Sequence, residues 1–400
     1  MSAAASARAL AALADGAFAA GRLALDTEFV GEGRYRTLLC LVQLAIPEGV
    51  GEGGRILLVD PLEAELDGAP LARALADPQV QVVVHAGRQD VALVRRRFAT
   101  EVTNVLDTQV AAGFAGLGAQ SSYDTLLAEI LGLRVAKTAS FTRWEKRPLS
   151  REQLAYARED VVHLLELAGE LERRLGELGR LEWAREECEP VARSSDERDP
   201  DAIFARLPRI GSLNARARPL ARELVWWRER TAERENRPVQ GVLGDASLVE
   251  IAKRRPRSRA ELARIRGVGA AAGGKRADDL LEAVRRGAAR PPEPAPPLAR
   301  GPLPKPDDAP LVALGEALLR ARAREAGLAY ELLAARADLQ AIVAAARAGG
   351  EQADVRTLRG WRRELAGDEL LELLAGHVSL SVSHASRAPR VAIRRPPQPE

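Results

Sequence analysis

The chain has 400 residues, of which 46% are hydrophobic and 29% charged, an ordinary composition for a globular protein of two or three domains. Its net charge is only +3, and its two cysteines lie far apart, which argues against a disulfide framework or a zinc site and fits the reducing cytoplasm. No apolar run is long enough to span a membrane, and we recognise no signal peptide.

The charge is unevenly distributed along the chain. Residues 1–170 contain 17 basic and 22 acidic residues, a net charge of −5, whereas residues 205–290 contain 21 and 10, a net charge of +11. An acidic first part followed by a basic middle part indicates divided tasks: one region could hold cations at a reactive site while the other binds a polyanion.

The first 170 residues have the pattern of an α/β domain. A helix over 3–20 precedes three strands at 23–30, 38–46 and 55–59, whose short links favour an antiparallel meander. Strands then alternate with helices: 66–76 (helix), 80–85 (strand), 88–98 (helix), 102–106 (strand), 108–116 and 123–131 (helices). This order predicts one mixed sheet flanked by helices, with the reactive site where strand ends meet helix starts.

Two carboxylates stand side by side on the first strand. Alternate residues of a strand point to opposite faces, so Asp26 and Glu28 share one face while Leu25 and Thr27 occupy the other. Two like charges so close repel each other unless a positive charge lies over them, and hard oxygen ligands suit Mg²⁺ or Mn²⁺. The alternative is an edge strand whose outer face is simply solvated.

Later acidic positions extend this pattern. Asp90 falls in the first turn of the helix at 88–98, where the helix dipole alone would also favour an acid. Ser150 and Gln153 predict a capping box, and in the helix that follows, Tyr156 and Asp160 are four residues apart and project from one face. The alternative for this pair is a tyrosine at the margin of the core with a solvated aspartate.

Several segments resemble the ribonuclease D family, which belongs to the tyrosine subtype of the DEDD 3′→5′ exonucleases. They are DTEF, LCLVQLA, HAGRQD, DTQVAAGF and WEKRPLSREQLAYAREDVVHL, within residues 20–170. The resemblance implies an RNase H-like fold. It also implies that two divalent metal ions, Mg²⁺ or Mn²⁺, are bound by Asp26, Glu28, Asp90 and Asp160, and that Tyr156 acts on the attacking water. Such a pair of ions suits phosphodiester hydrolysis.

Two residues before the tyrosine helix are candidate nucleic-acid ligands. Trp144 and Arg147 resemble the family's W-x-x-R-P segment, and they could stack on a base or touch a phosphate. Plain packing of Trp144 explains the same pattern equally well.

The rest of the chain is predicted to be helical. A charged connector at 171–205 leads to a unit at 206–290 that resembles an HRDC domain, a helical nucleic-acid-binding module. A Pro-rich linker follows at 291–310, then a second HRDC-like helical domain at 311–378 and a disordered tail at 379–400. Beside the Gly267-Val268-Gly269 turn, the first HRDC-type unit has a basic cluster that we expect to bind a polyanion: Lys253, Arg254, Arg255, Arg257, Arg264 and Arg266. A solvated basic face is the alternative.

These patterns predict an exoribonuclease that removes nucleotides from RNA 3′ ends and releases 5′-mononucleotides. By the resemblance its substrates are tRNA precursors with 3′ extensions, and we expect a monomer in the cytoplasm. A DNA exonuclease on the same fold is one alternative, and an inactive nucleic-acid-binding protein is another. A helicase accessory module is a third, although the chain lacks the Walker A loop of a helicase.

Overall fold

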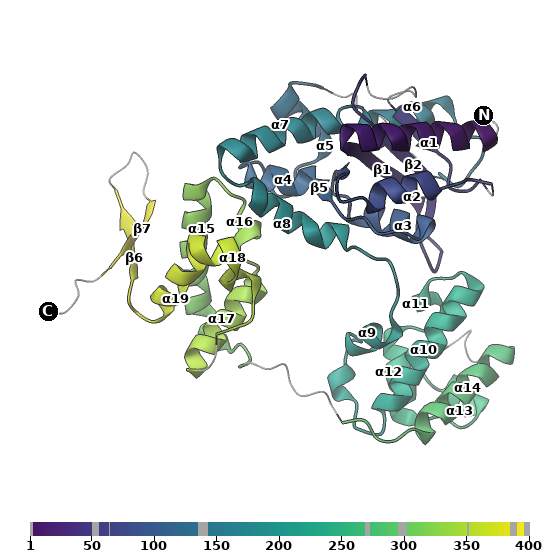
Figure 1. Cartoon of the computed structure of the whole chain (residues 1–400). Coiled ribbons are helices and arrows are strands. Elements are labelled where there is room, and N and C mark those ends of the chain that lie inside the picture. Colours follow the sequence, from purple (N-terminus) through teal and green to yellow (C-terminus); the bar gives the residue numbers. More distant parts are fainter. Residues whose placement is uncertain are drawn as a thin grey trace.

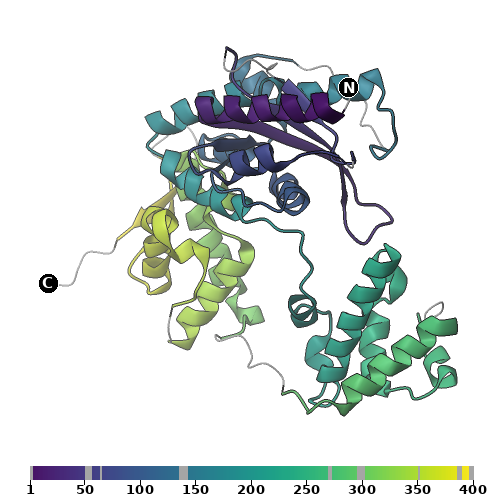
Figure 2. The same ribbon diagram turned by 45° about the vertical axis from the view of Figure 1, so that its right-hand side comes forward.

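The computed structural model consists of an α/β domain and two helical units, shown from two directions in Figures 1 and 2. It describes residues 3–49, 56–63, 65–134, 143–268, 273–294, 302–349, 352–384 and 390–395. No helix among these residues combines the length and the apolar character needed to cross a bilayer.

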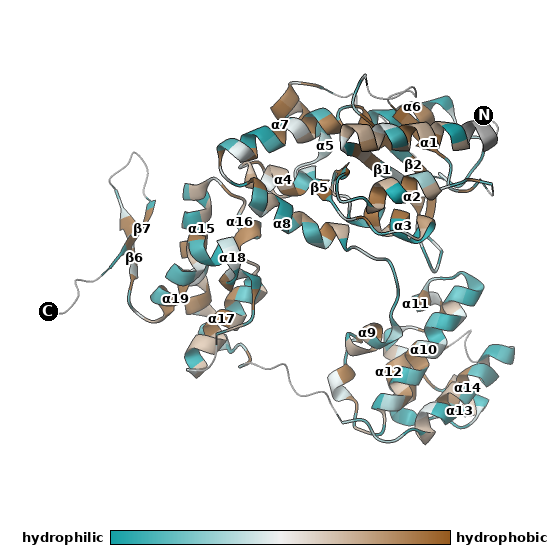
Figure 3. Ribbon diagram, in the orientation of Figure 1, coloured by the Kyte–Doolittle hydropathy of each residue, from teal (hydrophilic) through white to brown (hydrophobic). Residues whose placement is uncertain are grey.

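The α/β domain contains a mixed sheet of five strands in the order β3-β2-β1-β4-β5. The strands are β1 (Arg22–Val30), β2 (Leu38–Ala45), β3 (Ile56–Val59), β4 (Gln81–Val84) and β5 (Val105–Asp107). The first three form the predicted antiparallel meander, and β4 and β5 continue the sheet in parallel with β1. Hydrophobic residues predominate along the central strand β1 (Figure 3), which is expected for a strand covered on both faces.

Helices cover both faces of the sheet. They are α1 (Ala3–Ala20), α2 (Ala69–Ala76), α3 (Arg88–Phe98), α4 (Thr108–Phe114), α5 (Tyr123–Leu126) with a π-helical turn (Leu127–Leu131), α6 (Arg151–Val162), α7 (Leu164–Glu177) and α8 (Leu181–Ala192). The core that contains Leu23 and Leu25 of β1 includes residues of α1, α2 and α3, whereas Ala24 belongs to a second core with residues of α4 and α7.

The α/β domain continues beyond the boundary predicted at residue 170. That position lies inside α7, whose Leu171 and Leu175 are fully buried in the same core as Cys188 of α8. The thiol of Cys188 also accepts a hydrogen bond from the amide of Asp107 at the end of β5. Because α7 and α8 bury apolar side chains against the sheet, most of the predicted connector is part of the domain.

The first helical unit is built around one long helix, α10. Its helices are α9 (Pro200–Ala205), α10 (Arg218–Glu235), α11 (Val239–Val242), α12 (Asp245–Arg254), α13 (Arg259–Ala263) and α14 (Gly274–Ala289). The loop between β1 and β2 donates hydrogen bonds to this unit. The Tyr35 hydroxyl donates to Glu229 of α10 at 3.1 Å, and the Tyr35 amide donates to Asn236, the residue that caps α10, at 3.3 Å.

The second helical unit packs directly against the α/β domain. It contains α15 (Ala309–Ala326), α16 (Tyr330–Leu333), α17 (Arg336–Ala348), α18 (Gly360–Arg362) and α19 (Asp368–Leu374), with short 3₁₀ and π turns between them. The Trp361 ring stacks on Trp183 of α8, with centroids 5.1 Å apart, and meets Phe114 of α4 edge-on at 5.2 Å. Leu328, Leu332 and Leu333 are buried in the same core, so this unit is attached by a shared apolar core.

The prediction of a disordered tail from residue 379 is wrong for the residues that the structure describes there. Strands β6 (Ser379–Ser383) and β7 (Arg390–Arg394) pair in antiparallel fashion. The pairing places Leu380 opposite Ile393 and Val382 opposite Val391, and cross-strand apolar pairs of this kind stabilise a sheet. The alternation of serine with apolar residues in β6 is typical of a strand. The prediction of disorder rested instead on the Ser, Arg and Pro content of the whole tail.

Candidate active site

Asp26 lies in the middle of β1 and Glu28 lies two residues nearer its carboxyl end, so both carboxylates stand on the first strand, as the sequence predicts. Asp26 pairs with Gln43 of β2, and the register of the two strands shifts between Glu28 and Phe29, where Cys40 is the extra residue on β2. A β-bulge of this kind bends a strand and redirects its side chains, and bulges are common beside active sites. The bulge interrupts the pairing immediately after the second carboxylate, and the pairing resumes with Phe29 opposite Leu39.

Asp90 reaches the same end of the sheet from α3. In the parallel pairing of β1 with β4, Ala24 lies opposite Val83, so the chain leaves β4 beside Asp26 and enters α3 there. The turn is tight: a Cβ added to Gly87 would lie 2.4 Å from the Cβ of Val84. Glycine is therefore required at residue 87, directly before the helix. Because α3 begins at the next residue, Asp90 falls in its first turn.

The turn before α3 is held by Asp107, which is 2% exposed and was not among the predicted site residues. Its carboxylate accepts hydrogen bonds from the amides of Ala86 at 3.0 Å and Gly87 at 2.9 Å, and it also caps α4 by accepting from Gln109 at 2.9 Å. The sequence signal was an aspartate at the end of a strand and the start of a helix, which is typical of an N-cap.

Thr27 is a second residue that the sequence analysis missed. Its hydroxyl donates a short hydrogen bond to the Asp90 carboxylate, although Thr27 faces away from Asp26 and Glu28 on the strand. The hydroxyl is buried and fixes the orientation of Asp90. The only sequence signal was one polar residue on an otherwise apolar strand face.

Tyr156 and Asp160 come from α6, whose start is fixed by the predicted capping box. The Ser150 hydroxyl accepts from the Gln153 amide, and the Gln153 side chain accepts from the Ser150 amide. Burial and repulsion, first from Asp160 and then from Glu28 and Asp26, raise the pKa of Tyr156 to about 12. The hydroxyl thus lies among the carboxylates and stays protonated at neutral pH.

The four carboxylates influence one another strongly. Burial and repulsion from the other three raise the pKa of Asp26 well above its ordinary value. Burial and repulsion from Asp160 and Asp90 raise the pKa of Glu28 to about 8. Burial also raises the pKa of Asp90, even though its hydrogen bond from Thr27 opposes the change. The structure therefore brings the four predicted acidic residues into one negatively charged region.

Asp160 is the carboxylate that α6 contributes to this region. Burial, with repulsion from Asp124 and Glu159, raises its pKa to about 7. Among the described residues, no three acidic, histidine or cysteine side chains already surround a point where a metal ion would be held. The carboxylates are thus close enough to repel one another but are not drawn together around one centre.

The donor set nevertheless fits divalent cations. Oxygen ligands with an excess of negative charge are what Mg²⁺ and Mn²⁺ prefer, and cations would relieve the repulsion that raises these pKa values. Gln43, opposite Asp26, is 0% exposed, and its amide has no hydrogen-bond partner among the described residues. A buried polar group without a partner costs free energy of folding. This amide therefore adds an unpaired polar group beside Asp26.

Tyr123 of α5 completes the wall of this region. Its ring packs against His85 with centroids 5.7 Å apart, and burial with repulsion from Asp160 and Asp26 raises its pKa far above the ordinary value. His85 itself is hydrogen-bonded to Thr108 at 2.9 Å, which makes it a satisfied residue beside the site.

The structure does not favour nucleic-acid contacts for Trp144 and Arg147. Trp144 is 3% exposed and packs with Cys40, Leu41 and Ala157, so its ring is closed to a base. All five N–H donors of Arg147 are used: they bind Asp60 twice and the carbonyls of Trp144, Lys146 and Cys40. Arg147 therefore braces the segment before α6, and packing is the interpretation that the burial of Trp144 supports.

The predicted basic cluster lies at the end of α12 and near α13. Arg254 forms an ion pair with Glu250, and Arg255 ends the helix in the left-handed conformation at φ +52°. Lys253, Arg257, Arg264 and Arg266 complete the cluster, and no ion pair of their side chains is seen among the described residues. Gly269 of the adjacent turn lies outside the described residues.

Comparisons with known proteins agree with this arrangement. Residues 3–176 match the family model described as 3′-5′ exonuclease, and residues 217–284 match the HRDC domain model. Ribonuclease D of Gluconacetobacter diazotrophicus is 40% identical over 363 residues, which cover 90% of this chain and 89% of that protein. The chain belongs to the ribonuclease D family.

Further relatives support the same assignment. Ribonuclease D of Acidiphilium cryptum is 37% identical over 387 residues, 96% of this chain and 95% of that protein. The crystal structure of Escherichia coli RNase D, described as an exoribonuclease involved in structured RNA processing, has a TM-score of 0.75 and 26% identity, and the match covers 92% of this chain and 96% of that one. The predicted fold and the prediction of a ribonuclease D-type exoribonuclease are confirmed.

Proposed function

We propose that this protein hydrolyses the terminal phosphodiester of RNA with the help of two divalent cations and releases 5′-mononucleotides. The observation that carries the proposal is the group of four carboxylates, from β1, α3 and α6, whose charges raise one another's pKa beside the Tyr156 hydroxyl. Mg²⁺ or Mn²⁺ would be held by Asp26, Glu28, Asp90 and Asp160.

The bound cations would neutralise the phosphate and make the attacking water more acidic. Asp26, in the middle of the group, is the candidate for a ligand shared by both. Tyr156 orients the water through its hydroxyl and cannot serve as a base near neutral pH, because its pKa lies near 12. Attack on phosphorus breaks the bond to the 3′ oxygen, which takes up a proton and leaves as the new 3′ hydroxyl of the shortened RNA.

We infer that the substrates are tRNA precursors with 3′ extensions, processed in the cytoplasm. The involvement of the E. coli relative in structured RNA processing supports this inference, and the two buried, free cysteines suit a reducing compartment. We further propose that the basic cluster of the first helical unit attracts RNA, since the unit that contains it carries a net charge of +11.

The test is incubation of the protein with a tRNA that carries a 3′ extension and with a matched DNA, each with Mg²⁺, with Mn²⁺ and with a chelator. We expect stepwise shortening of the RNA and mononucleotide products only when a cation is present. Efficient cleavage of the DNA alone would establish the alternative, a DNA exonuclease, and equal activity in the chelator would contradict the role of cations.

The Asp26→Asn variant is the matched control in this experiment. We expect the substitution to remove about 4 kcal/mol of transition-state stabilisation, which lowers the cleavage rate roughly a thousandfold. Because the substitution removes one of several repelling charges, the melting temperature in chelator should not fall. An unchanged rate in excess Mg²⁺ would disprove the assignment of Asp26.

A further inference from the structure

The first helical unit contains a hollow of about 630 Å³ that lies on a different part of the unit from the predicted basic cluster. Its lining comes mainly from α10 and α14: Asp201, Arg222, Glu223, Trp226, Arg230, Arg286 and Arg290. The two helices can approach closely because α14 has a glycine at their crossing, where a Cβ on Gly287 would lie 2.6 Å from the Cα of Leu220. This crossing brings the arginines of α14 beside α10.

One buried carboxylate organises these arginines. Glu223 is 4% exposed and accepts hydrogen bonds from Arg286 at 3.0 Å and from Arg290 at 2.7 Å. The guanidinium of Arg230 lies 3.8 Å from the same carboxylate. Three positive side chains thus lie around a single negative charge, which holds Arg286 and Arg290 by charge-assisted hydrogen bonds.

The hollow keeps an excess of positive charge at its surface. The side chains of Arg230, Arg286 and Arg290 are 59%, 44% and 49% exposed. Arg222 is neutralised separately by Asp201 and Glu293. The remaining acid near the group, Glu282, lies 3.9 Å from Arg286 but is bound more closely by the neighbouring Arg285.

An aromatic ring borders these charges. Trp226 lines the hollow and is partly exposed, whereas the adjacent Trp227 is 5% exposed and belongs to the core of the unit. A partly exposed indole beside exposed guanidinium groups presents the two features that bind single-stranded nucleic acid, an aromatic ring and phosphate ligands. Trp227 belongs to the buried core of the unit, whereas Trp226 is not among the residues of that core.

We propose that this hollow is a binding site for single-stranded RNA, with one base stacked on Trp226 and the neighbouring phosphates bound by Arg230, Arg286 and Arg290. The proposal rests on the proposed function, because the RNA held here is the substrate whose 3′ end enters the site on β1. It assigns RNA recognition in this unit to α10 and α14, in addition to the attraction expected from the basic cluster.

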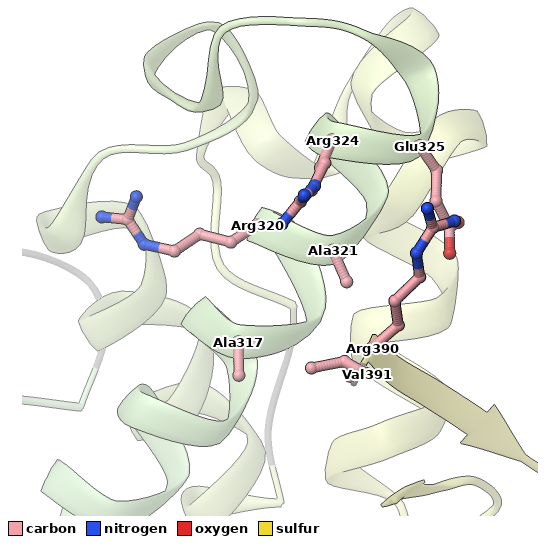
Figure 4. A pocket seen from close by; sticks show the side chains of 7 residues that line it. All are labelled: Ala317, Arg320, Ala321, Arg324, Glu325, Arg390 and Val391. Carbon is pink, nitrogen blue, oxygen red and sulfur yellow. The ribbon is translucent and has the colours of Figure 1, made fainter. Parts of the chain in front are cut away.

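A second arginine-bordered hollow, between α15 and β7, shows what this site has that others lack. It is lined by Ala317, Arg320, Ala321, Arg324, Glu325, Arg390 and Val391. In Figure 4 the Arg320 side chain points away from Ala321 and Val391; it pairs with Glu316 and lies over the Tyr330 ring at 4.2 Å. Among the described residues that line it, none is aromatic, and no buried carboxylate gathers its arginines.

The experiment measures binding of a single-stranded oligoribonucleotide to the full chain over a salt series, with Asp26→Asn in every protein to prevent cleavage. Arg230→Gln should reduce the slope of log affinity against log salt by about 0.7, the value for one phosphate contact. Arg234→Gln is the matched control, because Arg234 lies one turn further on α10, is 61% exposed and is also 3.8 Å from a glutamate, but does not line the hollow. Its slope should remain that of the parent protein.

Trp226→Ala should weaken binding by about 5- to 150-fold, the range for loss of one stacked base, without changing the salt slope. Trp226→Phe should restore most of the affinity, and melting temperatures should show that each variant is folded. Equal slopes for the two arginine variants, or full affinity of Trp226→Ala, would overturn the proposed site. Failure of the parent protein itself to bind RNA would instead overturn the proposed function together with the site.

Discussion

At the scale of single residues, Tyr156 is the most informative member of the site. Its hydroxyl lies among carboxylates, and its pKa near 12 keeps the proton in place, so the group can orient water without taking up its proton. We expect Tyr156→Phe to slow cleavage by roughly 10²–10⁴-fold. Isothermal titration with Mn²⁺ should give nearly unchanged metal affinity, and a loss of affinity as large as that of Asp160→Asn would show that Tyr156 holds the cation instead.

The raised carboxylate pKa values also predict how pH affects stability. In the metal-free protein Glu28 has a pKa of about 8 and Asp160 about 7, whereas both have ordinary values in the unfolded chain. The folded state thus binds more protons between about pH 4 and pH 8, and its stability falls as pH rises through that window. Melting temperatures in chelator should show this fall, and Mg²⁺ should reduce it by favouring the ionised carboxylates. A fall of the same size in Mg²⁺ would contradict cation binding by these groups.

A site residue could be predicted from the sequence when its partner lies in the same helix or strand. Asp26 with Glu28, and Tyr156 with Asp160, could be recognised because each pair shares one element at the spacing of its secondary structure. Thr27 could not, because its partner Asp90 is 63 residues away and approaches from another helix. Periodicity assigns faces, but it does not show which groups meet across elements.

At the scale of elements, the turn between β4 and α3 controls the position of Asp90. A Cβ at residue 87 would lie 2.4 Å from Val84, so Gly87→Ala should destabilise the protein by about 1–3 kcal/mol. Displacement of the helix start by about 1 Å should cost roughly a hundredfold in rate. Gly176→Ala is the control: nothing lies within 4 Å of its added Cβ in α7, and alanine should stabilise the helix slightly. Denaturant unfolding and cleavage assays measure both, and identical stabilities would refute this account of the turn.

Most helices and strands could be predicted because their periodicity is strong and their caps are explicit. The expected helix over 88–98 coincides with α3, and the capping box at Ser150 starts α6 as predicted. The roles of Trp144 and Arg147 could not be predicted, because the sequence pattern of a tryptophan and an arginine is the same whether they bind RNA or stabilise a loop. Their burial and hydrogen bonds decide the matter.

At the scale of the whole molecule, the uneven charge predicts a salt effect. Replacing Arg254, Arg255 and Arg257 together by Ala should reduce the salt slope of tRNA binding by up to about 2–3, because each phosphate contact contributes about 0.7 to 0.9. Turnover of short single-stranded RNA should change little, since the site on β1 is in another domain. An unchanged slope would mean that this face of α12 and α13 is only solvated.

The two helical units are attached to the α/β domain by contacts of different extent, and this difference governs the cooperativity of unfolding. The first unit is held mainly through one loop, where Tyr35 packs against its core and hydrogen-bonds to Glu229 and Asn236. The second shares a buried core with the α/β domain through Leu328, Leu332, Leu333 and Trp361, whose ring contacts Trp183 and Phe114. Calorimetry should therefore resolve two transitions, with the first unit melting alone and the second melting together with the α/β domain. Trp361→Ala should lower the temperature of the shared transition without dividing it, because Leu328, Leu332 and Leu333 keep the second unit in the common core.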